Sequence, residues 1–417
     1  MLFGSSGIRQ PFGPDLLSLA VSAGRAVAGS ASRVVLARDT RTTGPLLAEA
    51  VTSGLVAGGA RVATCGIAPT PTLAFAARGY DAGVMITASH NPEADNGIKL
   101  FNPDGSSFTR PQQEAVEADI RGSPSWADWT GQGSTEPREI TEAHITAIAG
   151  RFTLARPVKV VVDCGNGAAS GVTPALLALM GVKVVALNGN PAGRFARPSE
   201  PLEDNLPYLG EMVRRTGADC GIAHDGDADR MVAWDGRGRY IDGDRMLTLL
   251  ARFVGARRVV TTVDASMAVE AVGEVHRTPV GDAYVSEHLR GWGDFGGEPS
   301  GAWIFPGHSL CPDGIYAAAL LCTLASRLDL AAEVDRIARY PVLRTSLPSP
   351  RARDVLTELG ATSPTDGIRT EREGGWFLVR ASGTEPKIRI TAEGTTQERA
   401  KALLDEGLQM VRRATPP

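Results

Sequence analysis

The chain has 417 residues, which is too long for one ordinary domain and favours about three. Its 43 basic and 47 acidic residues give a net charge of -4, without the basic excess of a protein that binds nucleic acid or membrane surfaces. No apolar run approaches the roughly 18 residues that cross a bilayer, and the start MLFGSSGIRQ has no signal-peptide pattern, so we expect a cytoplasmic protein. Five cysteines without CxxC spacing predict buried free thiols, and six histidines show no zinc-type spacing.

Three segments repeat one order of elements. Each has a β-branched strand that ends in Asp, an Ala- and Leu-rich helical stretch, a second short strand, and a third strand that runs into a polar, glycine-containing loop. The first strands are 33–39, 159–167 and 258–266, and the loops are MITASHNP (85–92), GIAHDGDADR (221–230) and FGGEPSGAW (295–303). This order predicts three similar α/β domains with mainly parallel or mixed sheets. Because ligands bind beyond the C-terminal ends of such strands, we expect the three loops to share one cleft.

The C-terminal part follows another pattern. A short helix, two strands around a polar loop and a closing amphipathic helix over 396–414 predict a smaller α+β domain. The apolar stripe of the closing helix is Ala400, Leu403, Leu404, Leu408 and Val411. We place the four domains at 1–140, 141–245, 246–341 and 342–417. The segment 121–137, rich in Gly, Ser and Pro, is interpreted as a linker or surface loop.

The first polar loop pairs a serine with a histidine. Ser89 and His90 directly follow the apolar strand AGVMI, where a nucleophile would stand, although the same residue types also form ordinary turns. A few residues on, Lys99 lies in a turn that leads to a strand. Its cation could bind phosphate or exchange protons.

The second polar loop carries three aspartates two residues apart, Asp225, Asp227 and Asp229. Alternate side chains of an extended loop point the same way, so these carboxylates repel one another unless a cation lies among them. Oxygen ligands without His or Cys suit magnesium. A calcium-binding EF-hand would need Gly and Glu where Arg230 and Gly236 stand. The alternative is a solvated acidic turn.

The third polar loop, GGEPSG, offers Glu298 and Ser300 on either side of a proline. A carboxylate and a hydroxyl on a rigid turn could bind sugar hydroxyls through charge-assisted hydrogen bonds. A plain turn explains this motif equally well.

A fourth loop, RASGTEPKIRI, is rich in hydrogen-bond donors. Main-chain amides around a glycine, two hydroxyls and a guanidinium suit a phosphate dianion, whereas the alternative is a hairpin loop with solvated charges. The candidate phosphate ligands are Arg380, Ser382, Gly383, Thr384, Lys387 and Arg389.

These four loops, in this order and together with FGSSGIRQ at the start, resemble the α-D-phosphohexomutase superfamily over essentially the whole chain. The superfamily includes phosphoglucomutases, phosphomannomutases and phosphoglucosamine mutases. The resemblance implies four domains around a central cleft, the first three alike and the last smaller. It also implies phosphotransfer on a hexose phosphate through a phosphoserine and a hexose 1,6-bisphosphate.

The resemblance also implies roles for individual residues. Ser89 would be the phosphoserine, and the three aspartates would hold one Mg²⁺ together with its phosphate. Lys99, His90 and Arg9 would transfer protons and stabilise the transferring phosphoryl group. Arg230 would lie near the loop of the three aspartates. Glu298 and Ser300 would bind sugar hydroxyls, and the fourth loop would bind the non-reacting phosphate.

The sequence departs from the superfamily at two positions. Ala302 is followed by Trp303 where many bacterial relatives have His, and Ala283 stands where many relatives carry a basic residue. These departures leave the sugar open, while GGEPSG followed by WIFP resembles archaeal-type enzymes and favours conversion of glucosamine 6-phosphate to glucosamine 1-phosphate. The alternatives are a phosphomannomutase or phosphoglucomutase, a magnesium-dependent sugar phosphatase, and a non-catalytic sugar-phosphate-binding protein. A hexose phosphate is the expected partner, and the oligomeric state is not predicted.

Overall fold

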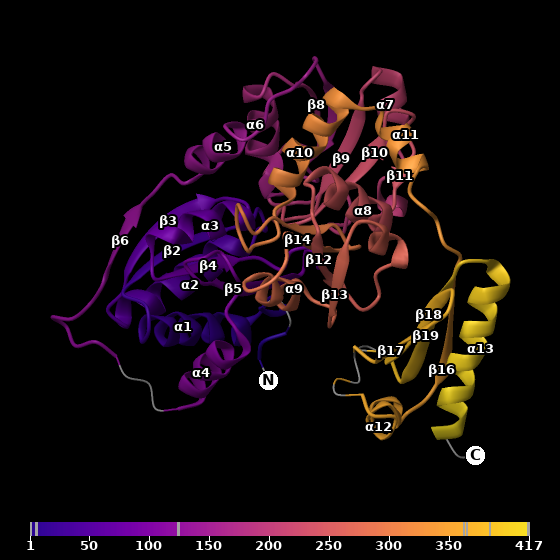
Figure 1. Ribbon diagram of the computed structural model, residues 1–417. Coiled ribbons are helices and arrows are strands. Elements are labelled where there is room, and N and C mark those ends of the chain that lie inside the picture. The colour runs from indigo at the N-terminus through magenta and orange to yellow at the C-terminus, as the bar shows by residue number, and fades with distance from the viewer. Residues whose placement is uncertain are drawn as a thin grey trace.

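The computed structural model describes residues 2–4, 7–122, 126–361, 363, 366–382 and 385–414. Four sheets follow one another along the chain, and Figure 1 shows the fourth, with its long helix α13, standing beside the other three. Short 3₁₀ helices lie in the connections: η1 (Ala77–Gly79), η2 (Ala168–Gly171), η3 (Glu203–Asn205) and η4 (Met267–Ala271). Within the described ranges, no helix combines the length and the apolar character needed to cross a membrane.

The first sheet has six strands in the order β1-β5-β4-β2-β3-β6. Strands β6, β3, β2 and β4 are parallel, and β5 and β1 run antiparallel at one edge. The edge strand β6 lies in the segment that we predicted to be a linker, so part of that segment is strand instead. The elements are β1 (Ile8–Pro11), α1 (Pro14–Ala28), β2 (Arg33–Arg38), α2 (Gly44–Ala57), β3 (Arg61–Ile67), α3 (Thr70–Ala76), β4 (Ala82–Ile86), β5 (Asp95–Phe101), α4 (Arg110–Arg121) and β6 (Ser134–Pro137).

The second sheet has the order β11-β10-β9-β7-β8. Its parallel centre is β8-β7-β9, and β10 and β11 follow as antiparallel strands. The elements are α5 (Thr141–Ala149), β7 (Lys159–Asp163), α6 (Thr173–Leu179), β8 (Lys183–Leu187), α7 (Leu209–Thr216), β9 (Cys220–His224), β10 (Met231–Asp235) and β11 (Tyr240–Ile241).

The third sheet has the order β13-β12-β14-β15 and shares its core with the second. One cluster of buried apolar residues runs from Val160 in β7 through Leu320 on α10 to Phe295 in β14. The domain boundary predicted after residue 245 falls inside α8. The elements are α8 (Gly243–Phe253), β12 (Arg258–Thr262), β13 (Glu274–Thr278), α9 (Asp282–Leu289), β14 (Phe295–Glu298), β15 (Ala302–Ile304), α10 (Gly314–Arg327) and α11 (Leu330–Asp335).

The fourth sheet is antiparallel, with the order β16-β19-β18-β17. Helix α13 buries Ala400, Leu403 and Val411 of its predicted stripe in the core that contains Phe377 and Ile390. The smaller α+β domain is thereby confirmed. The elements are β16 (Val342–Pro348), α12 (Ala352–Glu358), β17 (Ile368–Arg372), β18 (Gly375–Ala381), β19 (Lys387–Gly394) and α13 (Gln397–Ala414).

One connection recurs in each of the first three sheets. A parallel strand ends in a polar loop and the chain returns as its antiparallel neighbour, in β4–β5, β9–β10 and β14–β15. These three turns are the polar loops identified in the sequence, so the predicted repeat of three similar mixed-sheet domains is confirmed.

Candidate active site

Ser89 lies on the β4–β5 turn with its side chain directed at the acidic loop of the second sheet. Its backbone is left-handed, with φ of 50°, and its side chain is buried. Its Oγ donates a 2.7 Å hydrogen bond to Oδ2 of Asp225 and lies 3.3 Å from Nδ1 of His90. The structure therefore brings together two predicted loops that are 136 residues apart.

Arg41 holds the Ser89 loop, a function that the sequence reasoning missed. Its buried guanidinium donates four hydrogen bonds of 2.6 to 2.9 Å to main-chain oxygens of the loop, those of Ser89, Asn91, Pro92 and Asp95. Its Nε also donates to Oδ2 of Asp39, which accepts the Thr87 hydroxyl as well. The position of Arg41, two residues after the Asp that ends the first strand, was the only signal in the sequence.

Lys99 enters the acidic loop from β5. Its buried Nζ donates to Oδ2 of Asp227 at 2.8 Å and to Oδ2 of Asp229 at 2.6 Å. Burial alone would lower the pKa of Lys99, but the two aspartates raise it above its ordinary value. The Thr70 hydroxyl donates a further hydrogen bond to Asp227.

The acidic loop fits a hard divalent cation. Asp225, Asp227 and Asp229 each offer an oxygen within 4.8 Å of the others. Oδ1 of Asp227 and Oδ1 of Asp229 are buried without a hydrogen-bond partner among the residues that the structure describes. Burial, and then the two neighbouring carboxylates, raise the pKa of Asp225 well above its ordinary value. Unpaired buried carboxylate oxygens crowded together are what an oxygen-coordinated cation would satisfy.

Positive charge surrounds this loop. Arg230 donates its main-chain N–H to Asp225 at 3.2 Å, and its guanidinium lies 3.7 Å from Glu200. Arg9 donates from Nη1 to Asn91 at 3.4 Å, while its buried Nε has no partner in the described ranges. Burial, followed by the charges of Arg230, Arg9 and Lys99, lowers the pKa of His90 to about 3, so its imidazole is neutral at pH 7.

The β14–β15 loop joins the acidic loop directly. Met231 donates its main-chain N–H to the oxygen of Gly301 at 2.9 Å. Glu298 is buried and accepts a 2.8 Å hydrogen bond from the main-chain N–H of Gly281. Ser300, in contrast, is exposed. Burial, and then the charge of Asp282, raise the pKa of Glu298 to about 7.

The predicted phosphate loop lies between β18 and β19, on the separate fourth sheet (Figure 1). Gly383 and Thr384 lie outside the described residues. Ser382 Oγ is buried without a partner in the described structure. Lys387 and Arg389 both pair with Glu385, at 2.7 and 3.2 Å. Among the described residues, no hydrogen bond or ion pair joins Arg380, Ser382, Lys387 or Arg389 to the other three loops.

The family follows from comparison with known proteins. Phosphoglucomutase/phosphomannomutase alpha/beta/alpha domains I, II and III match residues 1–125, 141–238 and 242–340, and the C-terminal domain of that family matches residues 330–409. The chain belongs to the phosphoglucomutase/phosphomannomutase family. The resemblance to the α-D-phosphohexomutase superfamily is thereby confirmed.

Relatives of this phosphohexomutase family cover the chain from end to end. It is 45% identical to a "Probable phosphoglucosamine mutase" of Methanocella arvoryzae, over 99% of this chain and 98% of the relative. It is 40% identical to a phosphoglucosamine mutase of Methanococcus vannielii, over 98% of each. A solved phosphoglucomutase/phosphomannomutase family structure from Burkholderia thailandensis has a TM-score of 0.86 at 28% identity, over 100% and 99% of the two chains.

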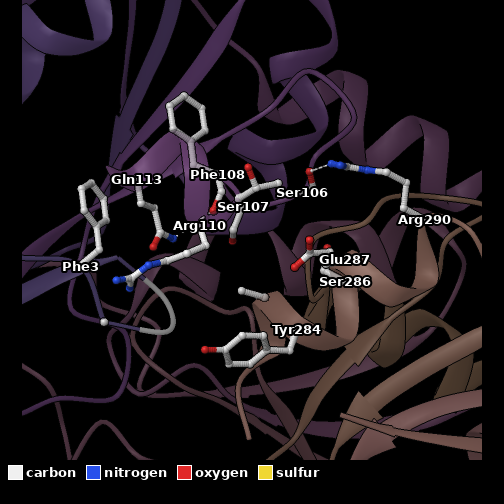
Figure 2. Close-up of a pocket in the computed structure, with 13 residues that line it drawn as sticks. Phe3, Ser106, Ser107, Phe108, Arg110, Gln113, Tyr284, Ser286, Glu287 and Arg290 are labelled. Carbon is white, nitrogen blue, oxygen red and sulfur yellow. Dashed lines mark hydrogen bonds between the residues drawn. The ribbon is translucent and has the colours of Figure 1, made fainter. Parts of the chain in front are cut away.

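Ala283, one of the two positions where we expected a departure from the superfamily, lies in a separate pocket. This pocket of about 230 Å³ lies between the first and third domains and includes Ala283 and Tyr284 in its lining. Figure 2 shows Arg110 and Arg290 at its sides, the latter bonded to Ser106. Of the predicted site residues that the structure describes, none lines it.

Proposed function

We propose that the protein is a cytoplasmic phosphohexomutase that moves a phosphoryl group between the 6- and 1-oxygens of a hexose, with Ser89 as the carrier. The observation that supports this most strongly is the 2.7 Å contact between Ser89 Oγ and Asp225. It joins a buried hydroxyl to the acidic loop, whose Asp227 and Asp229 also accept from Lys99. A hydroxyl so placed suits a phosphate, whose charge needs neutralisation.

The geometry of a hexose explains why a carrier is needed. The 1- and 6-oxygens lie on opposite sides of the sugar, so the group cannot pass directly between them. In the proposed reaction the bond between phosphorus and Ser89 Oγ breaks, and a bond from phosphorus to a sugar oxygen forms. The sugar hydroxyl loses a proton and Ser89 Oγ gains one, and neutral His90, 3.3 Å from Oγ, is placed to relay it. The bisphosphate then turns over and returns its other phosphoryl group to Ser89.

The three aspartates would hold magnesium together with the Ser89 phosphate. When bound, Mg²⁺ neutralises charge on the transferring group. Lys99, Arg9 and Arg230 add fixed positive charge on the protein side. Lys99 acts as a cation, because its hydrogen bonds to two aspartates stabilise the protonated form.

The two remaining loops would hold the sugar. Glu298 and Ser300 would bind hydroxyls that do not react. Arg380, Ser382, Gly383, Thr384, Lys387 and Arg389 would bind the phosphate that stays. Domain 342–417 contacts domain 246–341 through Asp366, which accepts a hydrogen bond from the main-chain N–H of Val280. The next residue, Gly281, donates its N–H to Glu298. The fourth domain is therefore attached beside the sugar loop, and rotation of this domain would be the motion that brings its phosphate loop to the substrate.

Glucosamine phosphate is the proposed substrate, because relatives that are 40 to 45% identical over almost the whole chain are named phosphoglucosamine mutases. Mannose or glucose phosphate is the alternative. This is suggested by the family name of the Burkholderia thailandensis structure, which is less similar in sequence at 28% identity.

Replacement of Ser89 tests the proposal. Mass spectrometry of the purified protein should find phosphate on the peptide that contains Ser89. Ser89→Ala should lose most conversion of hexose 1-phosphate to 6-phosphate, while Ser53→Ala, on a helix of the same domain, should retain it. Full activity of Ser89→Ala would exclude the phosphoserine, and release of inorganic phosphate in place of the isomer would indicate a phosphatase.

A further inference from the structure

A second cluster of metal-ligating side chains lies outside the proposed active site. His144 on α5, His308 in the loop after β15 and Asp313 at the start of α10 converge in the interior, and each side chain is at most 2% exposed. Helix α5, which carries His144, packs against both α3 and α10; Figure 1 shows the three helices. The two histidines are 164 residues apart, which is why the sequence showed no zinc-type spacing.

The separations within the cluster suit a tetrahedral ion. Nε2 of His144 lies 3.1 Å from Oδ2 of Asp313 and 3.3 Å from Nε2 of His308, and Nε2 of His308 lies 3.4 Å from the same Oδ2. Two ligand atoms bound at about 2.0 to 2.2 Å to a tetrahedral zinc ion are roughly 3.3 to 3.6 Å apart. Hydrogen-bonded N and O atoms are closer, at about 2.7 to 3.2 Å. Two of the three separations fall in the first range.

The outer atoms of two of these side chains are already occupied. The Thr72 hydroxyl lies 2.9 Å from Nδ1 of His144, and Oδ1 of Asp313 accepts the main-chain N–H groups of Ile315 and Tyr316 at 3.0 and 2.8 Å. Such outer contacts fix the orientation of a metal ligand and leave its inner atom free. Nε2 of His144 and Oδ2 of Asp313 are the atoms that remain to bind an ion.

The third side chain lacks an outer partner. Nδ1 of His308 is buried without a partner among the residues described. Its Nε2 lies 3.3 Å from Nε2 of His144, so both imidazoles direct this nitrogen at the one oxygen Oδ2 of Asp313. Buried networks built for stability usually pair such groups.

We propose that His144, His308 and Asp313 form a structural metal site for a late first-row divalent ion, with zinc as the expected occupant. Two imidazoles and one carboxylate suit Zn²⁺ and disfavour Mg²⁺, which takes oxygen ligands. The site takes no part in the proposed reaction and shares no ligand with the acidic loop.

The surroundings show what such an ion would hold. Thr72 lies on α3, whose first residue Thr70 donates hydrogen bonds to Asp227 through both its N–H and its hydroxyl. Gly314, directly after Asp313, donates its N–H to the main-chain oxygen of Ala228. The cluster therefore supports the acidic loop from two sides. An ion held by His144 of the second domain and by His308 and Asp313 of the third would fix these two domains against each other, beside α3 of the first.

Metal analysis of the full chain tests the site. Protein without a histidine tag is loaded with Zn²⁺, dialysed against buffer that contains Mg²⁺, and analysed by plasma mass spectrometry. We expect about one zinc per chain in the wild type and roughly a tenth or less in His308→Gln. The matched control His276→Gln, which alters a histidine that stacks on His288 and is not one of the three ligands, should keep its zinc.

The acidic loop needs its own control, because it could also take up zinc. Asp227→Asn should retain zinc if the histidine cluster holds it. Zinc that is lost from Asp227→Asn but kept in His308→Gln would overturn the proposal. Wild-type protein with no more zinc than His308→Gln would overturn it as well.

A second measurement tests the site without the His308→Gln variant, in case that variant does not fold. Wild-type protein loaded with Co²⁺ should show the intense visible absorption of a tetrahedral ion with nitrogen ligands. Thr72→Val, which keeps all three ligands, should bind Zn²⁺ about 10- to 100-fold more weakly in competition with a chromophoric chelator. Absence of the tetrahedral Co²⁺ spectrum in the wild type would refute the site.

Discussion

Arg41 donates a 2.9 Å hydrogen bond from Nη2 to the main-chain oxygen of Ser89, a residue whose φ of 50° is rare outside glycine. Three further carbonyls of the same loop accept from the same guanidinium. Because the rest of Ser89 is held in this way, its hydroxyl is directed at Asp225 before any substrate arrives. Arg41 is thus a positioning residue for the proposed carrier.

Arg41→Lys should preserve the charge beside Asp39 but lose the planar fork that reaches four carbonyls. We expect kcat to fall on the order of 10²-fold, since small misplacement of a reacting group has that cost, with little change in KM. Arg33→Lys, at the exposed start of β2, the strand that precedes Arg41, is the control. Steady-state kinetics of the two variants measure the effect, and equal kcat values would show that Arg41 is dispensable.

Removal of the cation should stop the reaction. Asp227→Asn leaves a weaker ligand where a buried, unpaired carboxylate oxygen now stands. We expect kcat to fall on the order of 10³-fold, because a metal ion supplies several kcal/mol of charge stabilisation. Calorimetric titration with Mg²⁺ should lose its signal in this variant. Undiminished turnover of the wild type in excess chelator would rule out a metal requirement.

The sugar loop should not distinguish the group at carbon 2. Glu298 is expected to contact hydroxyls that glucosamine, mannose and glucose share, so kcat/KM for their 1-phosphates should agree within about 10- to 200-fold. Glu298→Gln should weaken all three alike. A preference above about 10⁴-fold for one sugar would reveal a carbon-2 contact that this assignment lacks.

Asp244 should make the protein less stable as the pH rises. Burial, with Glu393, Asp242 and Asp264 nearby, raises its pKa from 3.8 to about 7, although the N–H of Ser266 partly offsets this. The folded state therefore binds more protons than the unfolded state between about pH 4 and 7, and the free energy of unfolding falls through that window.

Asp244→Asn should remove this fall and stabilise the protein by about 2 to 4 kcal/mol near pH 8, with little gain near pH 4. Thermal unfolding midpoints across that range measure it. Asp335→Asn, an aspartate on α11 whose pKa is lowered, is the control. Parallel pH profiles of Asp244→Asn and the wild type would contradict the shifted pKa.

The sequence predicted those parts of the site whose chemistry is local. The serine beside a histidine and the three alternating aspartates each form a recognisable group within six residues, and the strand pattern around them predicted the mixed sheets. The pattern also predicted that the polar loops meet at one cleft, and Ser89 and Asp225 of two such loops are in contact.

The remaining parts depend on contacts that no short pattern contains. Arg41 acts through loop carbonyls about 50 residues away, and Thr70 reaches Asp227 across 157 residues. His144 and His308 are neighbours only because α5 packs between α3 and α10. The strand β6 was hidden because its exposed, polar composition resembles a loop and its place is set by pairing with β3.

Transfer of phosphate from Ser89 tests the central proposal most directly. Protein labelled with radioactive phosphate on Ser89 is mixed with excess unlabelled glucosamine 1-phosphate and quenched at short times. We predict that the label leaves Ser89 and appears in the bisphosphate and then in glucosamine 6-phosphate, within the time of one turnover. Label that stays on the protein during turnover, or that appears as inorganic phosphate, would contradict the proposed mechanism.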